Sequence, residues 1–232
     1  MPYNPSQILL TKIMKLILLL CFTLVSSVTS AQELQPVSFA SADGGIVHAD
    51  YFHSGSKAIV LAHGAIFNKE SWSELTKNLL KNNISVLAIN FRGYGESTAG
   101  NRPVDKYEDI LAAVRFLHTQ PGISQISVLG ASMGGRAAAK AVIHSSPGEI
   151  NQLILLSPAT VTEPEKLKGD ILYIASESET IINAIKAQYQ KTPEPKQLKL
   201  IEGKAHAQHI FKTQENTALN ELIIHFLKSK SK

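Results

Sequence analysis

A serine flanked by glycines is the side chain in this sequence best placed for nucleophilic chemistry. Ser132 lies in the stretch Gly130-Ala131-Ser132-Met133-Gly134-Gly135, between an apolar run and a segment rich in alanine. Glycine two positions to either side of a serine permits a turn too sharp for side chains and lets the next helix pack closely on the strand. We therefore expect the Ser132 hydroxyl to project from a tight strand-to-helix turn.

The backbone after this serine offers a second chemical group. The N–H of Met133 falls in the first turn of the expected helix, where N–H groups have no intrahelical acceptor and the helix dipole is positive. A donor placed there stabilises the negative charge that develops on a carbonyl oxygen under nucleophilic attack. Ser132 and Met133 together predict acyl-transfer chemistry.

The elements that must position this turn follow an alternating pattern. Residues 37–40 and 46–52, separated by Asp43-Gly44-Gly45, predict an antiparallel hairpin with a glycine turn. Short apolar runs then alternate with segments whose apolar residues recur every three or four positions, which is typical of parallel strands with crossover helices. The strands are expected at residues 58–62, 85–91, 126–130, 153–157, 171–175 and 198–202, and the helices at 69–81, 104–119, 133–144, 180–189 and 214–228.

This pattern predicts an α/β fold: an open, mostly parallel twisted sheet with an N-terminal antiparallel hairpin and helices on both faces. Loops that leave the carboxyl ends of parallel strands converge on one edge of such a sheet. Functional side chains are therefore expected directly after the strands. Residues 32–232 contain no repeat, low-complexity tract or flexible linker, so we expect a single domain there.

Three further motifs follow predicted strands, and with the serine turn they carry a family resemblance. They are His63-Gly64-Ala65, Phe91-Arg92-Gly93-Tyr94-Gly95-Glu96-Ser97, and Gly203-Lys204-Ala205-His206-Ala207-Gln208-His209. In this order the four motifs resemble those of the α/β-hydrolase superfamily, over residues from about 58 to 226. Such hydrolases use a serine, an acid and a histidine in that chain order.

The resemblance implies roles for particular residues. The Ala65 N–H is the expected second donor of the oxyanion hole, with Ile66 as the neighbouring alternative. His206 is the expected general base, because a neutral imidazole suits proton transfer near neutral pH, and His209 is the spare candidate. His63 has a structural role in the family, and the loop around Arg92 shapes the rim of the site.

The acid position departs from the usual family pattern. The loop after the penultimate strand reads Ala175-Ser176-Glu177-Ser178-Glu179-Thr180 and contains no aspartate. A glutamate can replace it, since a carboxylate one methylene longer still accepts a hydrogen bond from the imidazole. Glu179 is the expected acid and Glu177 the alternative. A second departure, Asn90 where aspartate often stands, concerns packing.

The resemblance implies a serine hydrolase that acts on ester-type carbonyl compounds through an acyl-enzyme. Only about a dozen residues separate the strand that ends near Ser157 from the next, so no lid is expected over the site. This favours small or flexible esters, as for a small carboxylesterase or a dienelactone-hydrolase-like enzyme. Thioesterase and peptidase activities are alternatives. A further alternative is a non-catalytic binding protein of the same fold, in which the acid position has changed to glutamate.

The N-terminal residues have the layout of a secretory signal peptide. Lys12 and Lys15 precede an apolar run at residues 16–25 and a small-residue stretch that ends at Ala31. The run is too short for a membrane-spanning helix, which needs roughly 20 residues. We expect cleavage after Ala31, export to the periplasm or medium, and no stable membrane insertion. Residues 1–13 could be an over-extended start, with Met14 as the true one.

Composition excludes several other classes. Lysine and arginine total 23 against 19 aspartate and glutamate residues without a basic run, so nucleic-acid binding has no support. Cys21 is the single cysteine, which excludes an intramolecular disulfide. His206 with His209, and His48 with His53, lack a third metal ligand, and no glycine-rich nucleotide loop is present. We expect a small-molecule substrate and no metal or other cofactor.

Overall fold

A computed structural model describes residues 33–103 and 105–229. The predicted signal peptide, its cleavage site and the alternative start at Met14 lie outside the described residues. Within the described part of the chain, no helix has both the length and the apolar character needed to cross a bilayer.

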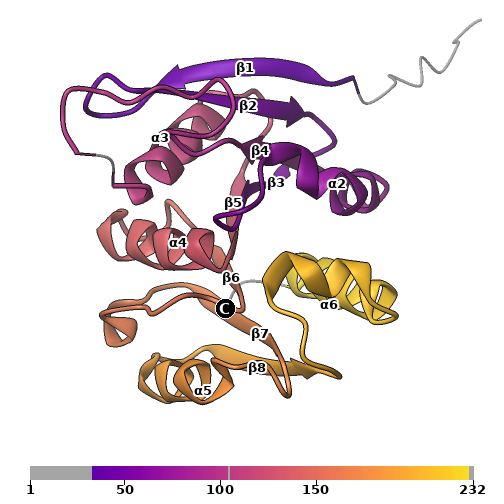
Figure 1. Ribbon diagram of the computed structural model, residues 1–232. Helices are drawn as coiled ribbons and strands as arrows, with labels where there is room; N and C mark the ends of the chain where they lie inside the picture. The colour runs from indigo at the N-terminus through magenta and orange to yellow at the C-terminus, as the bar shows by residue number, and fades with distance from the viewer. Residues whose placement is uncertain (1–32, 104, 230–232) are drawn as a thin grey trace, which may run out of the picture. The chain divides into compact units, whose positions relative to one another are not determined.

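Eight strands form one sheet (Figure 1). Their order across the sheet is β1-β2-β4-β3-β5-β6-β7-β8; β1 pairs antiparallel with β2 and β2 with β4, and all other neighbours are parallel. The strands are β1 (Gln35–Ala40), β2 (Ile46–Phe52), β3 (Lys57–Ala62), β4 (Ile84–Ile89), β5 (Gln125–Ala131), β6 (Gln152–Leu156), β7 (Asp170–Ser176) and β8 (Lys196–Ile201). This confirms the predicted fold class.

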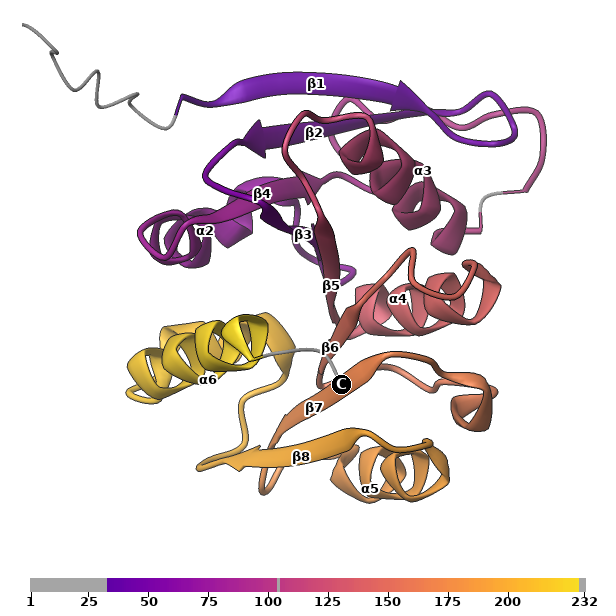
Figure 2. The same cartoon turned by 180° about the vertical axis from the view of Figure 1, so that it is seen from behind.

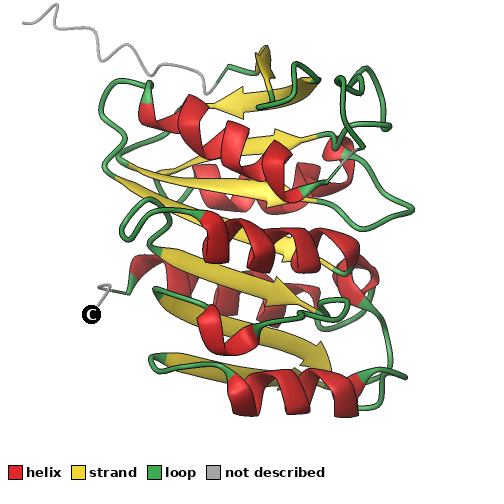
Figure 3. Ribbon diagram, turned by 90° about the vertical axis from the view of Figure 1, so that its left-hand side faces the viewer, coloured by secondary structure: helices red, strands yellow, loops and turns green. Residues whose placement is uncertain are grey.

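Helices cover both faces of the sheet (Figures 1 and 2). The α-helices are α2 (Ser73–Leu80), α3 (Tyr107–His118), α4 (Met133–His144), α5 (Ile182–Lys191) and α6 (Asn216–Lys228). Three 3-10 helices occupy connections: η1 (Lys69–Trp72), η2 (Pro164–Lys166) and η3 (Ala207–Lys212). Figure 3 looks onto the face that α3, α4 and α5 cover, and α2 and α6 cover the other.

The two faces have separate hydrophobic cores, because the central strands are apolar on both sides. Every residue of β4, β6 and β7 is buried, as expected for parallel strands between two helical layers. Val60, Val128 and Leu155 pack toward α3 and α4, whereas Leu61, Leu129 and Ile154 pack toward α2 and α6. The edge strand β8 alternates between exposed and less exposed residues instead.

The register aligns the carboxyl ends of the parallel strands. Ala62 of β3 pairs with Gly130 of β5, and Ala131 pairs with Leu156 of β6. Ser176, the last residue of β7, pairs with Ile201 of β8. The loops after β3, β5, β6, β7 and β8 therefore open at one edge of the sheet, where the candidate residues were expected.

The expected elements differ from the observed ones mainly at their ends. The helix expected at residues 69–81 is divided into η1 and α2, because the Asn68 side chain caps Ser71 and begins a tighter turn. The 3-10 helix after His206 had no counterpart among the expected elements. Between β6 and β7 lies only the short η2, so no lid domain is inserted there.

Candidate active site

Ser132 occupies a strained turn between β5 and α4. Its φ of 50° and ψ of −111° are unusual for a residue with a side chain. The backbone fixes this conformation at both ends, since the Ser132 N–H donates to the Leu156 carbonyl oxygen at 3.0 Å and its own carbonyl oxygen accepts from Ala159 N at 2.9 Å. The turn is thus tied to β6 and to the loop after it, and it presents the hydroxyl at the carboxyl edge.

The flanking glycines make this turn possible by close backbone approach. A Cβ on Gly134 would overlap the carbonyl oxygen of Ala62, and one on Gly130 would overlap that of Gly134. A Cβ on Gly135 would lie 2.9 Å from Pro158 Cα. The helix α4 therefore approaches β3 and the loop after β6 more closely than side chains would allow, as the glycine pattern indicates.

A continuous chain of hydrogen bonds links Ser132, His206 and Glu179. The Ser132 Oγ lies 2.9 Å from His206 Nε2, and His206 Nδ1 lies 2.7 Å from Glu179 Oε2. An ionised carboxylate only accepts hydrogen bonds, so Nδ1 carries the proton toward Glu179 and the neutral ring leaves Nε2 free to accept from the serine hydroxyl. The structure thus brings together the three residues expected from the sequence.

Glu179 is buried beside His206, and both of its carboxylate oxygens accept hydrogen bonds. Its side chain is 1% exposed, and Oε1 accepts hydrogen bonds from Ser157 Oγ at 2.7 Å and from the Ser176 N–H at 3.1 Å. Both donors come from the ends of neighbouring strands, β6 and β7. Glu177, the alternative acid, is exposed, and its N–H pairs with the Ile201 carbonyl oxygen instead. The structure therefore places Glu179, and not Glu177, against the imidazole.

Ser157 was not singled out from the sequence as a site residue. It is fully buried and has a φ of 42°, directly after β6. The signal that could have found it is a polar residue that ends an apolar strand at the carboxyl edge. Its hydroxyl supplies Glu179 with a neutral donor, which fixes the carboxylate without a competing charge.

The two expected backbone donors come from different segments, Ala65 from the loop after β3 and Met133 from the start of α4. Among the described residues, no acceptor is recorded for the N–H groups of Ala65 or Met133. The preceding N–H, of Gly64, donates to Gln208 Oε1 at 2.7 Å, and Gln208 Nε2 donates to Ser71 Oγ at 2.6 Å. The buried Gln208 therefore joins the loop that carries His206 to the loop that carries Ala65. No feature of the sequence pointed to it.

His63 is structural in its contacts. It is fully buried, its Nδ1 lies 2.8 Å from the Gly64 carbonyl oxygen, and its Nε2 accepts from the Phe91 N–H at 3.2 Å. Burial lowers the pKa of this imidazole, although the bond to the Gly64 carbonyl opposes the shift. The neutral ring thus fixes the loops after β3 and β4 to each other.

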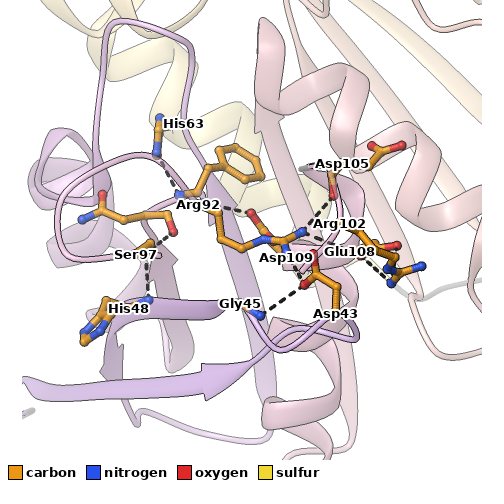
Figure 4. A network of polar contacts seen from close by, with 12 residues as sticks. Asp43, Gly45, His48, His63, Arg92, Ser97, Arg102, Asp105, Glu108 and Asp109 are labelled. Atoms are coloured by element: carbon orange, nitrogen blue, oxygen red, sulfur yellow. Dashed lines mark hydrogen bonds and ion pairs between the residues drawn. The ribbon is translucent and has the colours of Figure 1, made fainter. Parts of the chain in front are cut away.

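Arg92 is part of a buried ionic network (Figure 4). Its guanidinium binds Asp43 in the hairpin turn and Asp109 on α3, and all three side chains are fully buried. The hydrogen bond from Arg92 lowers the pKa of Asp43, whereas burial raises the pKa of Asp109 although Arg92 opposes it. The motif around Arg92 therefore joins the N-terminal hairpin to α3, and its expected role at the rim of the site stays a prediction.

The remaining candidates lie apart from this chain of hydrogen bonds. His209 packs its ring against Phe67, with 5.1 Å between ring centroids. Ile66 is 79% exposed at the tip of its loop. No group of three or more histidine, cysteine, aspartate or glutamate side chains in the described ranges is arranged to hold a metal ion.

A pocket of about 310 Å³ opens at Ser132 and His206. Its other walls are mostly small or apolar and come from Pro158 to Thr160 and from the start of α5, at Ile181 and Ala184. The short connection between β6 and β7 leaves it open. The sheet order, the strained serine turn and the hydrogen-bonded serine, histidine and glutamate define an α/β hydrolase.

The comparison with known families gives the same assignment. Residues 54–178 match the family described as serine aminopeptidase, S33, and the chain belongs to this family of α/β hydrolases. The structure is similar to that of EaEST, an esterase from Exiguobacterium antarcticum, with a TM-score of 0.72 and 14% identity over 84% of this chain and 100% of that one. At this identity the similarity concerns the fold.

Two curated relatives match parts of the sequence. The protein named "Thiohydrolase aneE" from Aspergillus aculeatus is 31% identical over an alignment of 172 residues that covers 68% of this chain and 52% of that protein. The "Multifunctional-autoprocessing repeats-in-toxin" of Vibrio cholerae is 30% identical over an alignment of 132 residues that covers 50% of this chain and 3% of the toxin. The chain thus spans about half of the first and a small fraction of the second.

Proposed function

We propose that this hydrolase cleaves carboxylic esters through a covalent acyl-enzyme on Ser132. The observation that carries the proposal is the unbroken chain from Ser132 Oγ through His206 to the buried Glu179 carboxylate. This arrangement allows an imidazole to remove the serine proton while the carboxylate stabilises the imidazolium that forms.

In the first half-reaction, Ser132 Oγ attacks the ester carbonyl carbon and its proton passes to His206 Nε2. The negative oxygen of the tetrahedral intermediate accepts hydrogen bonds from the Ala65 and Met133 N–H groups. The C–O bond to the alcohol then breaks, His206 returns the proton to the leaving oxygen, and the acyl group remains on Ser132.

In the second half-reaction, water attacks the acyl carbon and gives a proton to His206. The intermediate collapses, the acid leaves, and Ser132 Oγ recovers the proton from His206. The small side chains that line the pocket beside Ser132, together with the short connection between β6 and β7, favour short or flexible acyl groups.

The deciding experiment combines covalent labelling with turnover. Wild-type protein should react with a serine-directed fluorophosphonate and hydrolyse 4-nitrophenyl esters, with a preference for short acyl chains. Ser132→Ala should do neither, while Ser178→Ala, which changes an exposed serine of the acid loop, should do both. A folded wild-type protein that is not labelled would support a binding protein with the hydrolase fold.

A thioester is the second substrate class. The name of the relative from Aspergillus aculeatus, a thiohydrolase, favours it. The same groups would act, with a thiolate as the leaving group. Comparison of kcat/KM for an acetyl ester and the matching acetyl thioester separates the two activities.

We further propose that the hydrolase domain is exported after removal of residues 1–31. The charged, apolar and small-residue segments of this region support the proposal. Mass spectrometry of the protein from the periplasm or medium should find Gln32 as the first residue. Recovery of the uncleaved chain in the cytoplasm would contradict it.

A further inference from the structure

A second and larger pocket lies beside the one at Ser132. It has a volume of about 580 Å³ and is bounded by α4, the two residues before α3 and the loop after β6. Met133 lines it, and Arg136, one helical turn after Ser132, donates its N–H to the Ser132 carbonyl oxygen at 3.2 Å. Residues 158–160 of the loop after β6 line the pocket at Ser132, and residues 161–163 line this one. The two pockets therefore share one strip of chain.

The charges in this pocket do not balance. Its two acids are each paired with a lysine, Asp105 with Lys140 and Glu163 with Lys166. Its other two cations, Lys106 and Arg136, have no carboxylate within ion-pair distance among the described residues. Two positive side chains are thus available to an incoming group.

Lys106 lies near two aromatic rings of the segment that follows β4. Its Nζ lies 5.5 Å from the centroid of Tyr94 and 6.0 Å from that of Phe91. The Tyr94 hydroxyl in turn contacts Met133 Sδ at 3.7 Å. The ammonium and Met133, the proposed oxyanion donor, therefore line the same pocket and contact the same tyrosine.

We propose that Lys106 and Arg136 form an anion subsite, so that the preferred substrate is an ester that carries a carboxylate or phosphate group. This rests on the proposed function and specifies its substrate class. A guanidinium binds either anion with two parallel hydrogen bonds, and a lysine adds a point charge. Because Arg136 is exposed and Lys106 half-buried, little desolvation opposes the binding.

The test uses two matched pairs of esters. 4-Acetoxybenzoate and its methyl ester differ in charge on the alcohol side, and mono-4-nitrophenyl adipate and 4-nitrophenyl hexanoate differ on the acyl side. Binding is measured by NMR titration of Ser132→Ala, so that it does not depend on turnover. The anionic member of at least one pair should bind about tenfold more tightly, and this preference should shrink between about 0.05 M and about 0.5 M NaCl.

The variants Lys106→Gln and Arg136→Gln, each combined with Ser132→Ala, should each lower that preference about threefold or more and leave the neutral esters unaffected. Lys77→Gln and Arg115→Gln, which remove exposed cations from α2 and α3, are the matched controls and should keep it. Equal binding of the two members of both pairs, or equal losses in the variants and the controls, overturns the anion subsite.

Hydrolysis of the same esters by the protein with Ser132 intact tests the proposed function separately. Neutral esters that are cleaved without any anion preference refute the subsite alone. Anion binding without cleavage of any ester refutes the ester hydrolase alone.

Discussion

The buried Gln208 accepts a hydrogen bond from the N–H of Gly64, one residue before the expected oxyanion donor Ala65, at 2.7 Å. The same side chain donates to Ser71 in η1. One amide thus fixes the loop after β3 relative to the loop that carries His206. Gln208 does not touch the reacting atoms, so it is a positioning residue.

Replacement of Gln208 by leucine should release the loop that carries Ala65. We expect kcat for a 4-nitrophenyl ester to fall by about tenfold to a hundredfold, while KM changes little, because the loss falls on the transition state. Gln208→Glu keeps an acceptor for Gly64 and should recover much of the rate. Gln190→Leu, at an exposed position on α5, is the control. Equal rates in wild type and Gln208→Leu would remove this role.

Glu179 and Glu177 provide a matched pair for the acid. Glu179→Gln should lower kcat about a thousandfold, because an amide can donate to Nδ1 and stabilise the wrong tautomer of His206. Glu177→Gln should remain within about twofold, since Glu177 is exposed and its side chain has no recorded partner among the described residues. Steady-state kinetics on one ester checks both. Similar losses in the two variants would mean that the imidazole changes its partner in solution.

The Arg92 network should control stability. Arg92→Met leaves the buried carboxylates of Asp43 and Asp109 without their cation, and we expect the free energy of unfolding to fall by about 3–5 kcal/mol. Arg102→Met, which removes a half-exposed arginine paired with Glu108, should cost at most about 1 kcal/mol. Urea unfolding followed by circular dichroism measures both. Equal unfolding midpoints for Arg92→Met and wild type would show that the buried network contributes no net stability.

His63 should make stability depend on pH. Burial lowers its pKa in the folded state below the ordinary value of 6.5, so the unfolded chain binds the extra proton first as pH falls. Stability is therefore unaffected by this group above about pH 6.5, and it declines below that value by up to about 1.4 kcal/mol per pH unit until the folded-state pKa is reached.

The comparison that tests this pH dependence is with His63→Gln. The variant should be less stable at neutral pH, because an amide does not reproduce the two hydrogen bonds and the aromatic contacts of the imidazole ring, but its stability should decline less between pH 7.5 and pH 5.5. His118→Gln, at an exposed position, should follow the wild type. Parallel stability curves for His63→Gln and wild type would assign the acid sensitivity to other groups.

The sequence predicted the features that depend on local pattern. Apolar runs marked the parallel strands, and the glycines around Ser132 marked a turn whose close backbone contacts the structure displays. The positions of Glu179 and His206 after neighbouring strands followed from the rule that such loops share an edge. Register and loop length then sufficed to bring these side chains within hydrogen-bond distance.

Contacts between distant loops could not be predicted in the same way. Gln208 contacts Gly64 from the first turn of η3, which begins at Ala207 with a φ of 51° that an alanine in the sequence does not signal. Arg92 was expected at the rim, but its motif carries no information about Asp43, 49 positions earlier. Such pairs depend on how whole elements pack, and short motifs do not encode that packing.

Strand β8 lies at one edge of the sheet. Among the strands that the structure describes, it pairs with β7 alone, and the loop that carries His206 follows it directly. An edge strand with exposed residues opens at a lower free-energy cost than the central strands do. Local opening of β8 would separate His206 from Ser132, which is 74 positions away in the sequence, while the central strands and the helices on both faces stay folded. Hydrolase activity should therefore be lost at a lower denaturant concentration than the one that unfolds the whole domain.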